Sequence, residues 1–314
     1  MNNYLKYKPG WMQLLIFGSL TVGLFFAALF ITGIIPYLFH ISMAEFLSMD
    51  LSKPAVFSAA IAAQVIGTIV LFFMSGIIFA YLSDPKPLAY IGFKNPVPKS
   101  FYIIAIVIIV SAFPMVAWLS EINHNIHLPK EMHGVEKIIR DSEAQINDRI
   151  NTFLKMKSPL DLIKMLFFLA ILPAIAEEVF FRGVLQRLII LLTKRPWTGI
   201  IITGIIFSAL HGQYLGFFPR LVLGVVLGAL YWYSGSLWPG IIAHLINNAA
   251  QVILVYYNPQ IEEKNANFSV LLITASTFLV IALTWWMNRI SHTRFAEVYD
   301  TDDFHIGPRD QYIA

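Results

Sequence analysis

Eight long apolar runs, separated by short polar segments, account for most of this chain. A membrane-spanning helix needs about 20 mostly apolar residues, so each run is a candidate span. The fourth run is longer than one span needs, and a break near Gly183 would divide it into a span and an interfacial piece. The fifth run is short. The predicted spans lie at about 12–39, 54–82, 101–120, 162–193, 198–212, 217–234, 238–257 and 269–288.

The polar segment 121–161 is too long for a simple turn and has a pattern of its own. Apolar residues recur there at helical spacing among charged ones, which predicts an amphipathic helix. Such a helix lies either in the membrane interface or on the bundle as a surface helix. A role as a lid or substrate guide stays open. The apolar positions are Val135, Ile138, Ile139, Ile146, Ile150, Phe153 and Leu154.

Composition supports an all-α polytopic membrane protein. We expect a bundle of about eight transmembrane helices that contacts the lipid bilayer. The 314 residues are 57% hydrophobic and 13% charged, whereas a soluble globular chain has about 25% charged residues. The absence of cysteine excludes disulfides, thiolate metal sites and a cysteine nucleophile. No basic run suits nucleic acid, and no glycine-rich phosphate loop is present.

Lysine and arginine in the short loops predict the orientation, because cytoplasmic loops carry more of them. Counting from a cytoplasmic N-terminus favours both termini inside, in what we expect to be a bacterial cytoplasmic membrane. The residues on the inner side are Lys6, Lys8, Lys86, Lys94, Lys99, Arg187, Lys194, Arg195, Arg289 and Arg294, against Lys53, Arg220 and Lys264 on the outer side.

Three charged residues stand in the middle of the fourth run, between Ile171 and Gln186, where each charge costs about 2.5–3.5 kcal/mol on insertion scales. Glu178 and Arg182 are four residues apart, so they share a helix face and can neutralise each other. Glu177 lies about 100° around the helix and has no basic residue one turn away. Glu177 is therefore the carboxylate we expect to act as a general base.

The fifth and seventh runs supply the only histidines of the segment from the fourth run to the seventh. Phe207 lies one turn before His211, so its ring can hold the imidazole. His244 and Asn248 lie one turn apart on one face, and we expect Asn247 to point elsewhere.

Depth along the helices can be counted with a rise of about 1.5 Å per residue. From inner ends near residues 193, 198 and 238, Glu177 and His211 come out about 20–24 Å deep and His244 about 9 Å deep. These levels agree only if the fifth helix tilts or the fourth breaks near Gly183.

A glutamate, two histidines and an amide can activate water and stabilise an oxyanion, which peptide hydrolysis requires. In one version Glu177 and His211 deprotonate the water, and His244 and Asn248 donate to the oxyanion. In the other a divalent metal, zinc, is held by Glu178, His211 and His244. The specific H-E-x-x-H zinc motif is absent, which favours the first version, and zinc stays open.

The order of these motifs resembles the CPBP intramembrane proteases, the family of type II CAAX prenyl endopeptidases and bacteriocin-processing proteins. Each motif alone is weak, whereas three in the right order on separate apolar helices are specific. The motifs are E-E-x-x-x-R at Glu177, Glu178 and Arg182, F-x-x-x-H at Phe207 and His211, and H-x-x-x-N at His244 and Asn248.

The resemblance implies an eight-helix bundle with a water-filled site inside the membrane. It implies that Glu177 and His211 activate the water, that His244 and Asn248 form the oxyanion hole, and that the two remaining charged residues organise the site. Members are often described as metalloproteases, although the use of a metal has been disputed. Bacterial relatives generally lack prenylated substrates, so the family name does not predict the substrate of this chain.

We therefore expect three parts within one integrated bundle: residues 1–161 with three spans and the amphipathic loop, a catalytic core at 162–257, and residues 258–314 with the last span and a polar tail. The predicted activity is hydrolysis of peptide bonds in membrane-anchored proteins or peptides. Two alternatives remain, a proton- or cation-coupled transporter and a non-catalytic scaffold or immunity protein. The lack of an obvious internal repeat weakens the transporter reading.

Overall fold

The computed structural model describes residues 4–93, 97–258 and 268–291, and every regular element within them is helical. Seven helices are long and apolar enough to cross a membrane, and an eighth, α11 (Pro196–Leu210), is apolar but shorter. The all-α polytopic fold is thus confirmed. Lys94, Lys264 and Arg294 of the orientation argument, and the tail from residue 292, lie outside the described residues.

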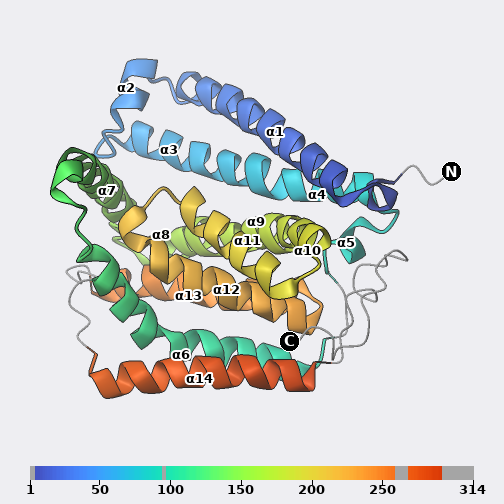
Figure 1. Cartoon of the computed structure of the whole chain (residues 1–314). Coiled ribbons are helices and arrows are strands. Elements are labelled where there is room, and N and C mark those ends of the chain that lie inside the picture. The colour runs from blue at the N-terminus through green and yellow to red at the C-terminus, as the bar shows by residue number, and fades with distance from the viewer. Residues whose placement is uncertain (1–3, 94–96, 259–267, 292–314) are drawn as a thin grey trace.

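The first two spans form one side of the molecule (Figure 1). A short helix, η1, precedes α1, and α2 connects α1 to the second span, whose middle segment η2 is π-helical. The small α5 follows. The bounds are η1 (Leu5–Tyr7), α1 (Gly10–Leu38), α2 (Met43–Ser48), α3 (Pro54–Gly67), η2 (Thr68–Met74), α4 (Ser75–Ser83) and α5 (Pro87–Tyr90).

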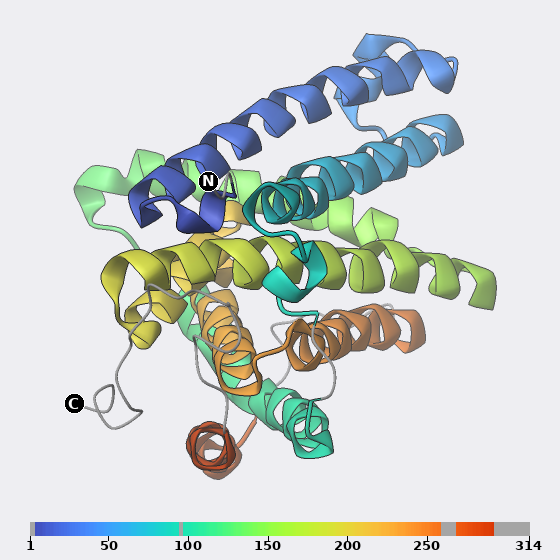
Figure 2. The ribbon, with the colours of Figure 1, turned by 90° about the vertical axis from the view of Figure 1, so that its right-hand side faces the viewer.

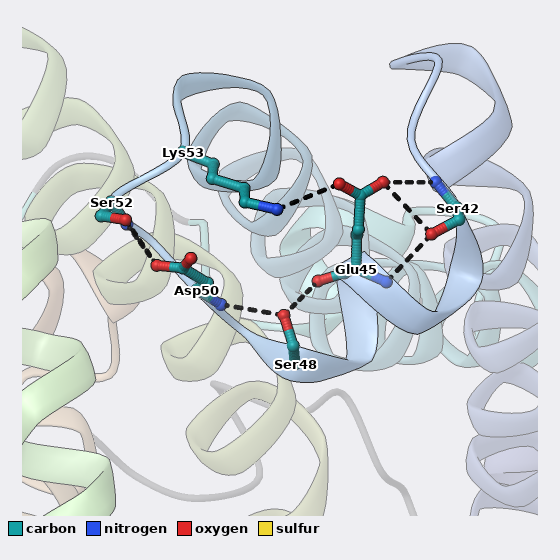
Figure 3. Close-up of polar contacts among 6 residues, drawn as sticks. All are labelled: Ser42, Glu45, Ser48, Asp50, Ser52 and Lys53. Carbon is teal, nitrogen blue, oxygen red and sulfur yellow. Dashed lines mark hydrogen bonds and ion pairs between the residues drawn. The ribbon is translucent and has the colours of Figure 1, made fainter.

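The α1–α3 connection is ordered by a capping box at the start of α2 (Figure 3). The backbone N–H of Glu45 donates to the Ser42 hydroxyl at 3.2 Å, and the Ser42 N–H donates to the Glu45 carboxylate at 3.1 Å. Lys53 at the start of α3 donates to the same carboxylate at 3.1 Å. The capping box satisfies donors at the start of α2, and the connection is further held by a small apolar cluster that includes the buried Leu51.

The predicted amphipathic helix is confirmed within the long connection between the third and fourth spans. It begins directly after a short 3₁₀ turn, and the fourth span then starts at a second capping box formed by Ser158 and Asp161. The bounds are α6 (Lys99–His124), η3 (Lys130–Met132), α7 (His133–Phe153) and α8 (Pro159–Met165).

The fourth span is one continuous helix from Pro159 to Thr193, so the break near Gly183 is not found. Two π-helical segments lie within it instead. The first directly precedes the turn of Pro173, which lacks an N–H and crowds the preceding turn, so a widened segment there accommodates the ring. The bounds are η4 (Leu166–Ile171), α9 (Leu172–Glu178), η5 (Val179–Gln186) and α10 (Arg187–Thr193).

This fourth span runs through the middle of the molecule (Figure 2). It contacts α1, η2 and α4 on one side and α11 and α13 on the other, while α6 packs against α12, α13 and α14. Every residue of η5 is buried. The remaining bounds are η6 (Tyr214–Gly216), α12 (Phe217–Ser234), α13 (Leu237–Tyr257) and α14 (Val270–Ile290).

Glycines allow close packing between α11, η5 and α12. A Cβ on Gly224 would lie 2.9 Å from the Cα of Gly204, and one on Gly228 would lie 2.6 Å from the Gln186 side chain. Gln186 donates to the carbonyl of Gly228 at 3.1 Å. Small residues thus let α12 approach the central helix closely enough for side chains to reach its backbone.

The turn between α12 and α13 is buried inside the bundle. Ser236 and Leu237 have no exposed surface, and the Leu237 N–H donates to the Gly92 carbonyl at 3.0 Å. The rings of Phe93 and Trp238 also meet, with centroids 5.3 Å apart. Helix α13 therefore begins beneath the segment that follows α5 and not at the edge of the bundle.

Candidate functional site

Glu178 and Arg182 form a fully buried ion pair in the central helix, as their spacing predicted. Nη1 of Arg182 donates to Oε1 of Glu178 at 2.8 Å, and neither side chain has exposed surface. Nη2 of Arg182 donates to the carbonyl of Gly224 at 3.0 Å. Burying two charges has a large desolvation cost, and the mutual pairing plus the contact with α12 offset it.

His244 of α13 joins this pair. Its Nδ1 lies 3.0 Å from Oε1 of Glu178, and the residue is 2% exposed. Since Glu178 is paired with Arg182, its carboxylate is the acceptor and Nδ1–H is the donor. Gly240, one turn earlier, makes the approach feasible, because a Cβ there would lie 3.1 Å from the second Glu178 oxygen. Glu178 thereby orients His244 so that Nε2 faces away from it.

Glu177 lies on the other side of that imidazole. Its Oε2 is 3.9 Å from Nε2 of His244, too far for a direct hydrogen bond. The Glu177 side chain is 13% exposed, and Oε2 itself is buried without a hydrogen-bond partner in the described part of the chain. A buried carboxylate oxygen without a partner is rare in proteins. The depth mismatch is therefore resolved, because Glu177, Glu178 and His244 meet.

His211 stands at the end of α11, where its exposed side chain is held by Phe207. Its Nδ1 donates to the Phe207 carbonyl at 2.7 Å, and the two rings are 4.8 Å apart, as predicted. This contact leaves Nε2 of His211 available.

The Phe207 ring connects more of the site than its sequence motif indicated. It lies 4.8 Å from the guanidinium carbon of Arg182 and 5.7 Å from the His244 ring, and it is 1% exposed. One aromatic side chain therefore touches the ion pair and both histidines. The spacing of Phe207 to His211 predicted one of these three contacts, while the other two depend on how α11 packs.

Asn248 lies one turn after His244 and is partly exposed. Its side-chain oxygen accepts a hydrogen bond from Nδ2 of Asn247 at 3.2 Å, which leaves the Asn248 N–H groups free to donate. Asn247 was expected to point away from the face of His244 and Asn248, and its amide contacts Asn248. Within the described residues no hydrogen bond joins Asn248 to Glu177, Glu178 or the histidines.

The metal version required Glu178, His211 and His244 around one ion. Among the described residues, no group of three or more His, Asp or Glu side chains is placed to hold a metal. Oε1 of Glu178 is also occupied by Arg182 and His244, so it supports the histidine as an outer partner would. As placed, the described side chains do not form a three-ligand site, and the use of a metal stays a prediction.

Comparisons with known proteins match part of the chain. Residues 159–250 match the family model described as type II CAAX prenyl endopeptidase Rce1-like. The uncharacterized protein YpbD of Bacillus subtilis (strain 168) is 38% identical over 91 residues, which is 28% of this chain and 43% of that relative. The chain thus matches less than half the length of YpbD. No solved structure matches the chain significantly. The three motifs lie within this matched segment, so the predicted resemblance is confirmed for residues 159–250, which are similar to the Rce1-like family model.

Proposed function

We propose that this protein is an intramembrane endopeptidase in which Glu177 is the general base. The observation that carries the proposal is the buried, unpartnered Oε2 of Glu177, which lies 3.9 Å from Nε2 of His244. This distance is too long for a hydrogen bond between the two atoms, and it leaves room for a reacting group that hydrogen-bonds to both. The Rce1-like match over residues 159–250 supports the same reaction class.

The proposed mechanism assigns protons in the buried cluster by charge balance. Ionised Glu178 and Arg182 cancel, so an ionised Glu177 is compensated only if His244 is protonated on both nitrogens. His244 then donates Nδ1–H to Glu178 and presents Nε2–H to the substrate carbonyl. The cluster is neutral overall, which is the arrangement that a low-dielectric site favours.

The reaction then proceeds by attack of water on a peptide carbonyl. Glu177 takes a proton from the water as the new C–O bond forms, and His211, held by Phe207, orients that water through Nε2. Nε2–H of His244 and the free amide of Asn248 donate to the developing oxyanion. Collapse of the tetrahedral intermediate breaks the C–N bond, and Glu177 gives its proton to the leaving amine. The expected substrates are membrane-anchored proteins or peptides.

The test is cleavage of a mixed-sequence library of membrane-spanning peptides by purified protein, with Glu177→Gln as the variant. The amide keeps the size of Glu177 but cannot take the proton, so we expect a loss of at least about 100-fold in rate. Glu121→Gln, an exposed glutamate of α6, is the matched control and is expected to be fully active. Retained cleavage by Glu177→Gln would remove Glu177 from the mechanism.

A strong chelator, combined with metal analysis of the purified protein, separates the two versions of the chemistry. We expect unchanged cleavage at negligible metal content, since the described residues do not assemble a three-ligand site. Loss of activity in chelator, restored by zinc, would favour the metal version.

A further inference from the structure

The loop that follows His211 is fastened to helix α7 by a buried carboxylate. Glu143 is the one described residue of α7 that is buried, at 3% exposure. Its Oε1 accepts a hydrogen bond from the backbone N–H of Leu215 at 2.6 Å. Leu215 stands four residues after His211, at the centre of η6.

A buried carboxylate on an otherwise solvent-accessible helix has a desolvation cost, which this contact offsets. The chain could place any apolar residue there if the position served packing alone. A carboxylate instead provides an acceptor for a loop N–H that has no partner within a regular α-helix or strand. The position is therefore suited to holding the loop.

The space around this contact is not filled by side chains. A cavity of about 240 Å³ lies between α7, the end of α6 and the loop. It is lined mainly by apolar groups, among them Ile139 of α7 and Phe217 at the start of α12. Since packing is incomplete here, hydrogen bonds and not apolar burial hold α7 to the loop. Asn147 contributes a second bond from α7, accepting from Gln213 at 3.1 Å.

His211 needs this support because its own contacts are few. His211 caps the C-terminal end of α11, and Gly212 after it adopts a left-handed conformation with φ +66°. On the other side of the loop, Asn123 of α6 binds the Tyr214 carbonyl at 2.8 Å and the Phe218 N–H at 2.9 Å. The loop is thus held between α6 and α7, with Glu143 as the α7 contribution.

We propose that Glu143 is a positioning residue for the hydrolysis, which holds the loop after His211 so that this imidazole stays in reach of Glu177. The inference rests on the proposed function. It assigns a catalytic purpose to the amphipathic helix, whose sequence pattern left its role open.

The test compares Glu143→Ala with Glu143→Gln in the full-length purified protein. Gln retains an oxygen that can accept from Leu215, whereas Ala removes the acceptor. A displacement of about 1 Å can reduce a rate about 100-fold, so Glu143→Ala is expected to lower kcat by about ten- to a hundredfold with KM nearly unchanged. Glu143→Gln should stay within about threefold. Asp141→Ala, which removes an exposed carboxylate of the same helix, is the control and should be unchanged.

A second readout does not depend on activity. In protein with ¹³C-labelled histidine, the His211 ring signal is assigned by its loss in His211→Asn. We expect that signal to move in Glu143→Ala and to stay in place in Glu143→Gln and Asp141→Ala. An unmoved His211 signal in Glu143→Ala overturns the positioning role, as does a Glu143→Gln enzyme that is as slow as Glu143→Ala. If the wild type cleaves no peptide, the proposed function fails, and the ring signal still decides whether Glu143 positions His211.

Discussion

Two buried carboxylates of this protein are stabilised in different ways. Glu178, in the central helix, has no exposed surface and contacts a guanidinium and an imidazole. Glu143, in α7, is 3% exposed and accepts from one backbone N–H. A charge deep in the bundle needs opposite charges, because water is distant and the dielectric is low. A carboxylate near the end of the bundle, on a helix surrounded by solvent-accessible positions, is sufficiently stabilised by one directed hydrogen bond.

The largest expected effect comes from breaking the central pair. Arg182→Leu leaves Glu178 buried without its main counter-charge, and we expect a loss of about 3–5 kcal/mol in the free energy of unfolding. Arg140→Leu, which breaks the ion pair of Arg140 with Glu136 on α7, is the surface comparison and is expected to cost much less. Denaturant titration in mixed micelles measures both. Equal losses would contradict the distinction between the two regions.

Glycine substitutions sharpen the same comparison through packing. Gly224→Ala places a methyl group 2.9 Å from the Gly204 Cα, and we expect a destabilisation of about 1–3 kcal/mol. Gly134→Ala, in α7, meets nothing within 4 Å, and we expect a gain of about 0.5–1 kcal/mol from helix propensity. The same titrations measure both changes. A Gly224→Ala protein as stable as wild type would show that α12 does not pack as closely as described.

The smallest expected effect is a pH dependence of stability that comes from Glu136, in the first turn of α7. Hydrogen bonds from Arg140, then His127 and the Leu128 N–H, lower the pKa of Glu136 from 4.5 to about 2. Because the folded pKa is depressed, this stabilisation is present above pH 4.5 and is lost as the pH falls towards 2.

Thermal unfolding of wild type and Glu136→Gln at a series of pH values tests this dependence. The wild type should melt higher than the variant at neutral pH, and the difference should shrink between pH 4.5 and pH 2. A difference that stays constant over that range would mean that the Glu136 charge contributes nothing.

Much of the site could be predicted because the chemistry follows helical spacing. Glu178 and Arg182 are four apart, and Phe207 and His211 are four apart, so local geometry alone predicted both contacts. The spacing also identified Glu177 as the carboxylate without a partner on its own helix. Contacts between helices could not be predicted in this way. The bond from Glu178 to His244 joins residues 66 positions apart, and it depends on how α13 packs against α9.

One expectation from the sequence failed. A break near Gly183 was considered because the fourth run is longer than one span needs, and the helix is instead continuous through η5. Counting residues along each helix also could not show that Glu177, Glu178 and His244 meet, because that depends on packing between helices.

The sequence by itself determined the helices, their number and the side chains that carry charge into the bundle, because apolar length and four-residue spacing are local properties of a chain. The tertiary structure alone decided which glutamate pairs with Arg182 and His244 through one carboxylate oxygen and which has no such pair. That choice depends on where α13 places the His244 ring, with Nδ1 towards Glu178 and Nε2 towards Glu177. The physical reason is that desolvation and pairing of a buried charge depend on neighbours brought close by folding, and those neighbours are distant along the chain.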